Sequence, residues 1–225
     1  MKERPILFRG EMVRAILAGS KTQTRRMFDK KRARWFAAGG WERDTDNWPM
    51  GMDDGGDYVR ASSPFGHAGD RLWVRETWME YERTSEEERA PRGGKPLNPF
   101  VKIIYRADYK KDPCPGEWRP SIFMRREQCR LRLGVLKIRV ERLDDITEDD
   151  AIAEGCDAGE DKASGMDLFR MPGHKIGDKG YASPEIAYCA AFRAMHKLAP
   201  TDNPWLWVVE FKRTPFQQKT TGDSK

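Results

Sequence analysis

The chain has 225 residues, with 41 Lys and Arg against 36 Asp and Glu and a formal net charge of +5. Eight Trp, ten Phe and six Tyr are too many aromatic residues for a disordered chain, so we expect a packed core. No apolar run approaches the roughly 20 residues of a membrane span, and the first residues lack the apolar stretch of a signal peptide. We therefore expect a soluble, cytoplasmic protein with no membrane partner.

The net charge is unevenly distributed along the sequence. Residues 1–35 carry eleven Lys and Arg against three Asp and Glu, whereas residues 141–167 carry eleven Asp and Glu against two Lys and Arg. Such segregation is typical either of two solvated surfaces or of a face that binds a polyanion. The charge pattern alone leaves both interpretations open.

The cysteines and histidines are scattered. Cys114, Cys129, Cys156 and Cys189 form no Cys-x-x-Cys pair, and the three histidines stand far apart. Zinc sites need paired ligands, and disulfide frameworks belong to secreted chains. We expect reduced cysteines that pack in the core, no metal site and no cofactor.

Hydrophobic spacing and turn residues predict the elements. In chain order they are a strand at 4–8, a helix at 12–17 that ends at Gly19, strands at 72–78, 101–106 and 130–143 with a bulge at Gly134, an acidic helix capped by Thr147 that ends at Gly155, a helix at 184–198, and a strand at 205–211. Because the helices stand beside loops and do not alternate with strands, the expected fold class is α+β, a small mixed β-barrel with flanking helices.

The domain organisation follows from the loops between these elements. We expect one domain over residues 1–213, since no linker separates two apolar sets. Irregular, Gly-rich insertions are expected at about 29–68, 79–100 and 156–182, and a disordered tail at 214–225.

The most concentrated polar segment is residues 19–26, directly after the first helix. In an extended strand Lys21 and Thr24 would point to opposite faces, whereas a turn at 21–22 would bring them together. A Lys that is kept from water loses pKa and can act as a base, and a Thr hydroxyl can then attack a carbonyl. A solvated basic turn is the alternative interpretation.

Residues 16–26 resemble the signature of the ASCH domain, a member of the PUA-like superfamily: a helix that ends in Gly, followed by Lys-Thr-x-Thr-x-Arg. Three later segments resemble the same family: the Gly-Asp turn and strand at 69–74, the strand and acidic helix at 140–155, and the closing strand at 205–211. The longer motif at 69–78 is similar to ASCH proteins carried by phages and prophages. The resemblance implies a PUA-like barrel.

The resemblance also implies a site. One compact bacterial ASCH enzyme is an amidohydrolase that removes the acetyl group from N4-acetylcytidine with a Lys, a Thr and a Glu, which correspond here to Lys21, Thr24 and Glu154. In this hypothesis Thr24 attacks the amide, Lys21 takes its proton, and Glu154 passes a proton to the leaving amine. A water activated by Lys21 or Glu154 would serve equally, and backbone N–H groups near residues 19–22 would stabilise the oxyanion.

Two alternatives remain open, because members of the superfamily bind RNA or modified bases. The first is a non-catalytic module for RNA, a nucleoside or modified nucleic acid; its binding residues would be Thr22, Arg25, Arg26, Arg75, Trp73 and Trp78, with Trp35 as a further stacking candidate. The second is a ribonuclease. A metal-dependent form would use carboxylates of residues 144–150, although such a run is typical of helix capping. Glu76 would line the site or pair with Arg75.

Overall fold

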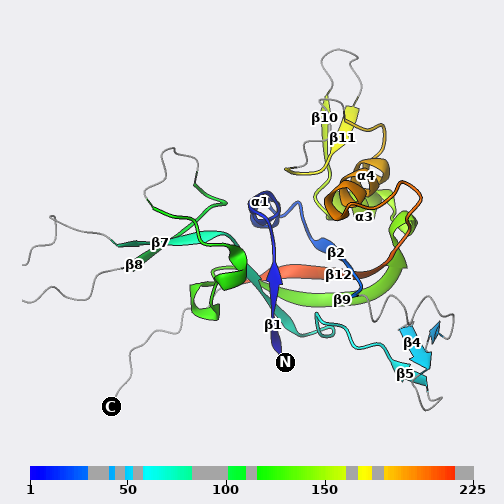
Figure 1. Cartoon of the computed structure of the whole chain (residues 1–225), viewed down its shortest axis with the longest axis horizontal. Coiled ribbons are helices and arrows are strands. Elements are labelled where there is room, and N and C mark those ends of the chain that lie inside the picture. The colour runs from blue at the N-terminus through cyan, green and yellow to red at the C-terminus, as the bar shows by residue number, and fades with distance from the viewer. Residues whose placement is uncertain are drawn as a thin grey trace, which may run out of the picture.

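The main element of the computed structural model is a strongly curved five-stranded sheet in the order β1-β6-β9-β12-β2 (Figure 1). The structure describes residues 1–29, 41–43, 49–52, 58–82, 101–109, 116–160, 167–173 and 180–215. The five strands are β1 (Glu3–Leu7), β2 (Gln23–Met27), β6 (Arg71–Arg75), β9 (Arg132–Arg142) and β12 (Trp205–Thr214). β1 pairs with β6 in parallel, and the other neighbours are antiparallel. The predicted α+β class is confirmed.

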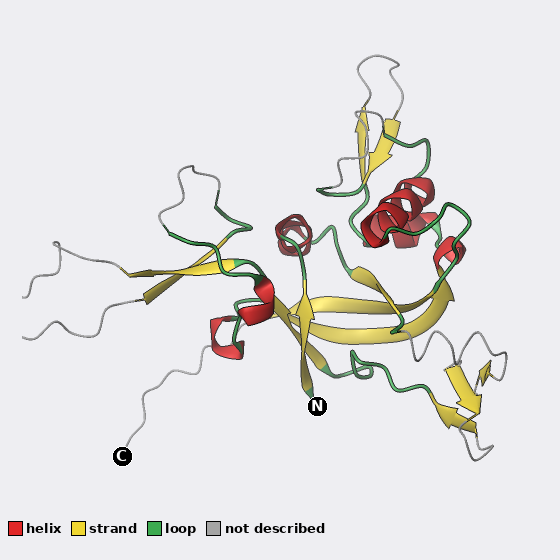
Figure 2. Cartoon of the chain, viewed as in Figure 1, coloured by secondary structure: helices red, strands yellow, loops and turns green. Residues whose placement is uncertain are grey.

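Helices and smaller sheets surround this sheet (Figure 2). The helices are α1 (Gly10–Ala18), α3 (Glu148–Ala153) and α4 (Pro184–His196), with 3₁₀ turns η2 (Ser121–Phe123), η3 (Arg126–Gln128) and η4 (Leu143–Asp145). The smaller sheets are the pairs β7 (Trp78–Glu82) with β8 (Val101–Tyr105) and β10 (Asp157–Glu160) with β11 (Asp167–Arg170), and the trio β3 (Trp41–Arg43), β4 (Pro49–Met52) and β5 (Tyr58–Arg60). No helix in the described ranges is both long enough and apolar enough to cross a membrane.

The predicted helices and strands are present except that the strand expected at 72–78 is divided, because β6 ends at Arg75 and Trp78 begins β7 in another sheet. The expected irregular loops are partly wrong. The three-stranded sheet lies within 29–68, and β10 and β11 lie within 156–182. These strands are three or four residues long, too short to show an alternating pattern. Residues 83–100 lie outside the described residues, as do residues 216–225 of the predicted tail, and β12 itself extends to Thr214.

The bulge is also displaced from its predicted place. Gly134 pairs regularly with Arg71 and Lys212, and the register of β9 against β12 shifts at Leu136 instead. A Cβ at Gly134 would lie 3.2 Å from Cγ2 of Thr214, so this glycine permits a close approach in the sheet.

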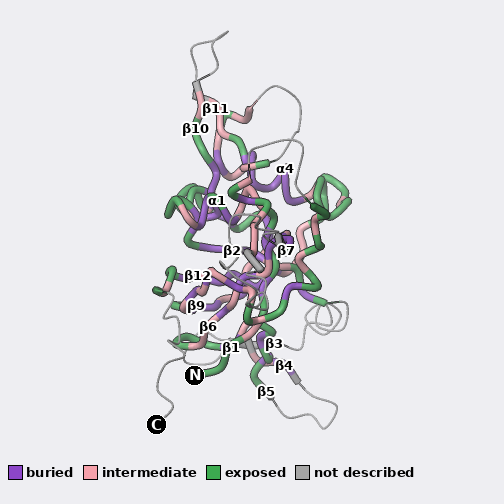
Figure 3. Tube along the Cα trace, turned by 90° about the vertical axis from the view of Figure 1, so that its left-hand side faces the viewer, coloured by how far each residue is buried: buried purple, intermediate pink, exposed green. Residues whose placement is uncertain are grey.

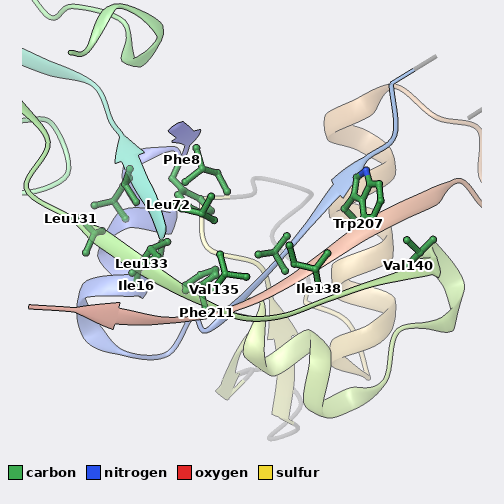
Figure 4. Packing of buried hydrophobic residues seen from close by; sticks show 14 of the residues in the cluster. Phe8, Ile16, Leu72, Leu131, Leu133, Val135, Ile138, Val140, Trp207 and Phe211 are labelled. Carbon is green, nitrogen blue, oxygen red and sulfur yellow. The ribbon is translucent and has the colours of Figure 1, made fainter. Parts of the chain in front are cut away.

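β12 lies between two hydrophobic clusters, because successive side chains of a strand point to opposite faces. Trp207 packs in the cluster that joins the sheet to α1 (Figure 4), and Leu206 packs in the cluster of α3 and α4. Both side chains are at most 1% exposed. Burial is concentrated where the sheet meets the helices (Figure 3). The helices are therefore anchored on the strand that also pairs with β2.

The two edge strands of the sheet approach one another at Arg26. Its Nη2 donates to the Leu7 carbonyl at 2.5 Å, and its guanidinium lies 5.0 Å from the centre of the Phe8 ring. A side chain of β2 thus contacts the end of β1, although no ladder joins these strands in the described residues.

We predict that Gly19→Ala destabilises the protein by about 1–2 kcal/mol, because Gly19 ends α1 with φ 85° and its N–H donates to the Ile16 carbonyl. Nothing lies within 4 Å of an added Cβ, so the cost is conformational. Urea denaturation measures it. The control Gly116→Ala has negative φ and only a 3.5 Å contact, and should change stability by under about 0.5 kcal/mol. Equal effects would contradict the prediction.

Candidate functional site

A buried ion pair joins the first helix region to the acidic helix. Lys21 Nζ donates to Glu154 Oε2 at 2.6 Å and to the main-chain carbonyl of Glu154 at 2.8 Å. Both residues are at most 3% exposed. The backbone holds the pair together, because the Thr22 N–H donates to the Ala153 carbonyl at 2.9 Å, just before Glu154 ends α3. Segments more than 130 residues apart therefore meet at one point.

The pair lies at the floor of a cavity of about 480 Å³, which Thr24 also lines. Lys21 and Thr24 share this cavity because β2 begins only at Gln23, so residues 21–24 are not one continuous strand, although the structure assigns no turn at 21–22. The volume is within the range of about 300–1,000 Å³ that is typical of small-molecule sites. Apolar and aromatic side chains form the walls, including Leu7, Phe8, Met12, Met171, Tyr188 and Phe192.

Burial changes the acid–base properties of the cavity. Desolvation lowers the pKa of the Lys21 amine below its ordinary 10.5, against the attraction of Glu154, and the positive charges of Arg26 and Arg25 lower it further. Burial likewise raises the pKa of the Tyr188 phenol well above 10. Lys21 is therefore easier to deprotonate than a solvated lysine, whereas Tyr188 stays neutral at physiological pH.

An ion-pair network supports the floor from behind. Arg25 has a fully buried side chain whose Nη2 donates to Glu141 and Asp150 at 2.8 Å each, and Arg139 also pairs with both carboxylates. The charge of Arg25 is therefore paired inside the protein, and because Arg25 also lines the cavity, its contact with phosphate stays a prediction. Arg25 fixes the start of α3, and with it Glu154.

Three polar atoms of Glu154 and Arg25 have no hydrogen-bond partner in the described part of the chain. They are Oε1 of Glu154 and Nε and Nη1 of Arg25, and Oε1 and Nη1 form only a long ion pair of 3.8 Å. Buried polar groups normally have partners, because an unpaired one costs about 1–3 kcal/mol. Glu154 Oε1 is thus available as a hydrogen-bond acceptor for a ligand.

The other predicted binding residues do not come together at the cavity. Trp78 is 2% exposed, so the prediction that it stacks on bases is wrong. Arg75 donates to the Met124 carbonyl and lies over the half-buried Trp73 ring, and neither residue lines the cavity. Thr22 is exposed and contributes only main-chain bonds in the described residues.

Of the predicted arginines, Arg25 and Arg26 both line the cavity. Trp35 lies outside the described residues.

Three of the four predicted oxyanion donors already have partners inside the protein. The N–H groups of Gly19, Lys21 and Thr22 donate to the carbonyls of Ile16, Ala15 and Ala153. These bonds give partners to carbonyls at the ends of α1 and α3, which a helix leaves unpaired. The three N–H groups are therefore not free to stabilise an oxyanion.

Three of the remaining acidic candidates are paired with arginines. Glu76 is bound by Arg130 at 2.8 and 2.9 Å, not by Arg75, and it does not line the cavity. Asp144 pairs with Arg193, and Asp150 with Arg25. The described acidic residues contain no group of three or more that could hold a metal ion.

The thiols that the structure describes, Cys129, Cys156 and Cys189, are buried and free, whereas Cys114 lies outside those residues.

The lining residues that were not predicted from the sequence include Arg9, Tyr188 and His196. Tyr188 and His196 belong to α4, whose apolar face indicates only a core helix, and Arg9 lies in the link between β1 and α1. Tyr188 and His196 reach the cavity because α4 packs on β12, the strand that pairs with β2.

Comparisons with known proteins, by family models and by searches of the curated proteins and of the solved structures, found no match to this chain. The chemistry of the cavity therefore carries the functional inference.

We predict that Lys21→Met destabilises the protein by about 3–5 kcal/mol, because it leaves the Glu154 carboxylate buried without its principal partner. The double substitution Lys21→Met/Glu154→Met should cost less than the sum of the two single substitutions, since it removes both charges. A double-mutant cycle by urea denaturation measures the difference. Additive costs would show that the two groups do not interact.

Proposed function

We propose that the chain is an ASCH-type, PUA-like protein whose cavity hydrolyses the amide of an N4-acylated cytidine. The observation that carries the proposal is the buried Lys21–Glu154 pair at the floor of a cavity that Thr24 also lines. The sequence resemblance to the ASCH enzyme points to the same three residues without reference to the fold. The curved sheet, with its edge strands in contact through Arg26, is compatible with a PUA-like barrel.

The cavity suits a cytosine base. Tyr188 and Phe192, whose ring centroids are 5.8 Å apart, provide aromatic surface, and Leu7, Met12 and Met171 add apolar surface to the lining. Carboxylates accept hydrogen bonds from the exocyclic N4 of cytosine. The unpartnered Oε1 of Glu154 offers such an acceptor next to Lys21 and Thr24, so the acylated amine would meet all three groups.

In the proposed reaction the Thr24 hydroxyl attacks the acyl carbon and transfers its proton to the neutral Lys21 amine. The proton then passes over the 2.6 Å contact to Glu154, which delivers it to N4 as the C–N bond breaks. Cytidine leaves, and water hydrolyses the acyl-threonine to the free acid. Direct attack by a water that Lys21 or Glu154 activates gives the same products without the covalent intermediate.

A binding module without turnover is the second candidate. It is favoured by the two hydrogen bonds that Lys21 donates to Glu154, because a stable ion pair holds both groups in place. In that case the same cavity would recognise a base of RNA or of modified nucleic acid through Glu154. Binding of cytidine derivatives with no release of acid would distinguish this module from an enzyme.

We predict that the purified protein releases acetate from N4-acetylcytidine, and that Lys21→Met and Glu154→Gln each reduce kcat/KM by about 10²–10⁴-fold. Thr24→Val should cause a similar loss if Thr24 is the nucleophile, and a smaller loss if water attacks directly. Thr201→Val makes the same change at an exposed residue outside the cavity and should retain activity. Turnover equal to wild type in folded Lys21→Met and Glu154→Gln would overturn the assignment.

We also predict a pH dependence. Because burial lowers the pKa of Lys21, its neutral base form accumulates as pH rises and dominates at a pH below 10.5. The kcat/KM for N4-acetylcytidine should therefore rise with pH and reach a plateau below pH 10.5. Lys21→Arg, which stays protonated, should show low activity without this rise. A profile of the arginine variant parallel to that of wild type would contradict Lys21 as the base.

A further inference from the structure

The cavity has a buried end and an exposed end. Lys21, Thr24 and Glu154 at the floor are each under 5% exposed, whereas Arg9 and His196, which also line the cavity, are exposed. A ligand whose reacting group reaches the floor must therefore direct its other end toward Arg9 and His196. We call this exposed end, with Arg9, Arg26 and His196, the cavity mouth.

Arg26 links the floor to the mouth. It lies two residues after Thr24 on β2, so both side chains point to the same face, with about 6.6 Å between their backbone positions. Its guanidinium is held over the Phe8 ring and by the Leu7 carbonyl. Its Nε atom is buried and has no hydrogen-bond partner in the described part of the chain. Arg26 is thus a positioned cation with an unused donor.

Among the described residues, no carboxylate forms an ion pair with the arginines of the mouth. The carboxylates that line the cavity are Glu11, which pairs with Arg14, and Glu154, which pairs with Lys21.

The histidine of the mouth responds to the same charges. Burial, followed by the charges of Arg26 and Arg9, lowers the pKa of the His196 ring. Arg9 and Arg26 therefore both lie close enough to His196 to disfavour its protonation, and an anion beside these groups would relieve this repulsion.

We infer that the cavity mouth binds the phosphate of a nucleotide, so that the preferred ligand is a phosphorylated cytidine and not the free nucleoside. This inference rests on the proposed function, in which the base occupies the floor. The ribose then lies between the apolar walls, and its phosphate meets Arg9 and Arg26. Guanidinium groups suit this position because their paired N–H groups match two phosphate oxygens.

Calorimetric titration of the full chain with cytidine and with cytidine 5′-monophosphate tests the inference. Wild type should bind the monophosphate at least about tenfold more tightly, and Arg9→Gln and Arg26→Gln should each remove most of that difference while affinity for cytidine stays within about twofold. Arg213→Gln makes the same charge change at an exposed arginine that does not line the cavity, and should keep the preference. Arg9 is exposed, so its variant should fold even if Arg26→Gln is unstable.

The outcomes separate this inference from the proposed function. Equal affinity of wild type for the two ligands overturns the phosphate site alone, and so does a preference that survives in folded Arg9→Gln and Arg26→Gln. Preference for the monophosphate without hydrolysis of any N4-acetylated substrate overturns the enzyme alone. Absence of binding by both ligands overturns both proposals.

A third ligand identifies the source of the phosphate. A cytidine-containing trinucleotide that binds more tightly than the monophosphate assigns the site to a strand, and the reverse order assigns it to a mononucleotide. Both results support a phosphate site at the mouth.

Discussion

The structure depends on one buried contact, the ion pair between Lys21 and Glu154. Two opposite charges that are almost inaccessible to water must satisfy each other, because desolvation of a lone charge costs several kcal/mol. Their pairing requires the end of α1, the start of β2 and the end of α3 to meet. The main-chain bond from Thr22 to Ala153 reinforces the same junction. The acid and the base of the site are thus also the contact that positions these three elements.

β12 connects the elements around the ion pair to the hydrophobic core. Trp207 belongs to the cluster of the sheet and α1, and Leu206 to the cluster of α3 and α4, so one strand joins the two halves of the hydrophobic interior. β12 also pairs with β2, which supplies Thr24 and Arg26. The cavity is therefore the space enclosed where a helical layer and the edge of a curved sheet are held on a common strand.

Two adjacent arginines of the cavity differ in how the protein pairs their charge. Arg25 is buried and paired with Glu141 and Asp150, and it stabilises the start of α3. Arg26, the next residue, also lines the cavity, and among the described residues no carboxylate forms an ion pair with it. Because successive side chains of a strand point to opposite faces, the two guanidinium groups meet different neighbours. The amino-acid composition and the net charge of +5 do not show that one of these arginines is paired and the other is not.

The sequence by itself determined the order and type of the main elements, because apolar periodicity, the cap at Thr147 and the glycine at position 19 are local signals. It also identified Lys21, Thr24 and Glu154 as a set, through resemblance to a family motif. It did not reveal the short strands of β3–β5 or β10–β11, which have too few residues for a period.

Only the tertiary structure decided which polar groups are buried together. The burial of Trp78, the use of three N–H groups of residues 19–22, and the presence of Arg9 and His196 at the mouth all depend on contacts between distant segments. The pKa of Lys21 likewise depends on desolvation, which no local pattern encodes.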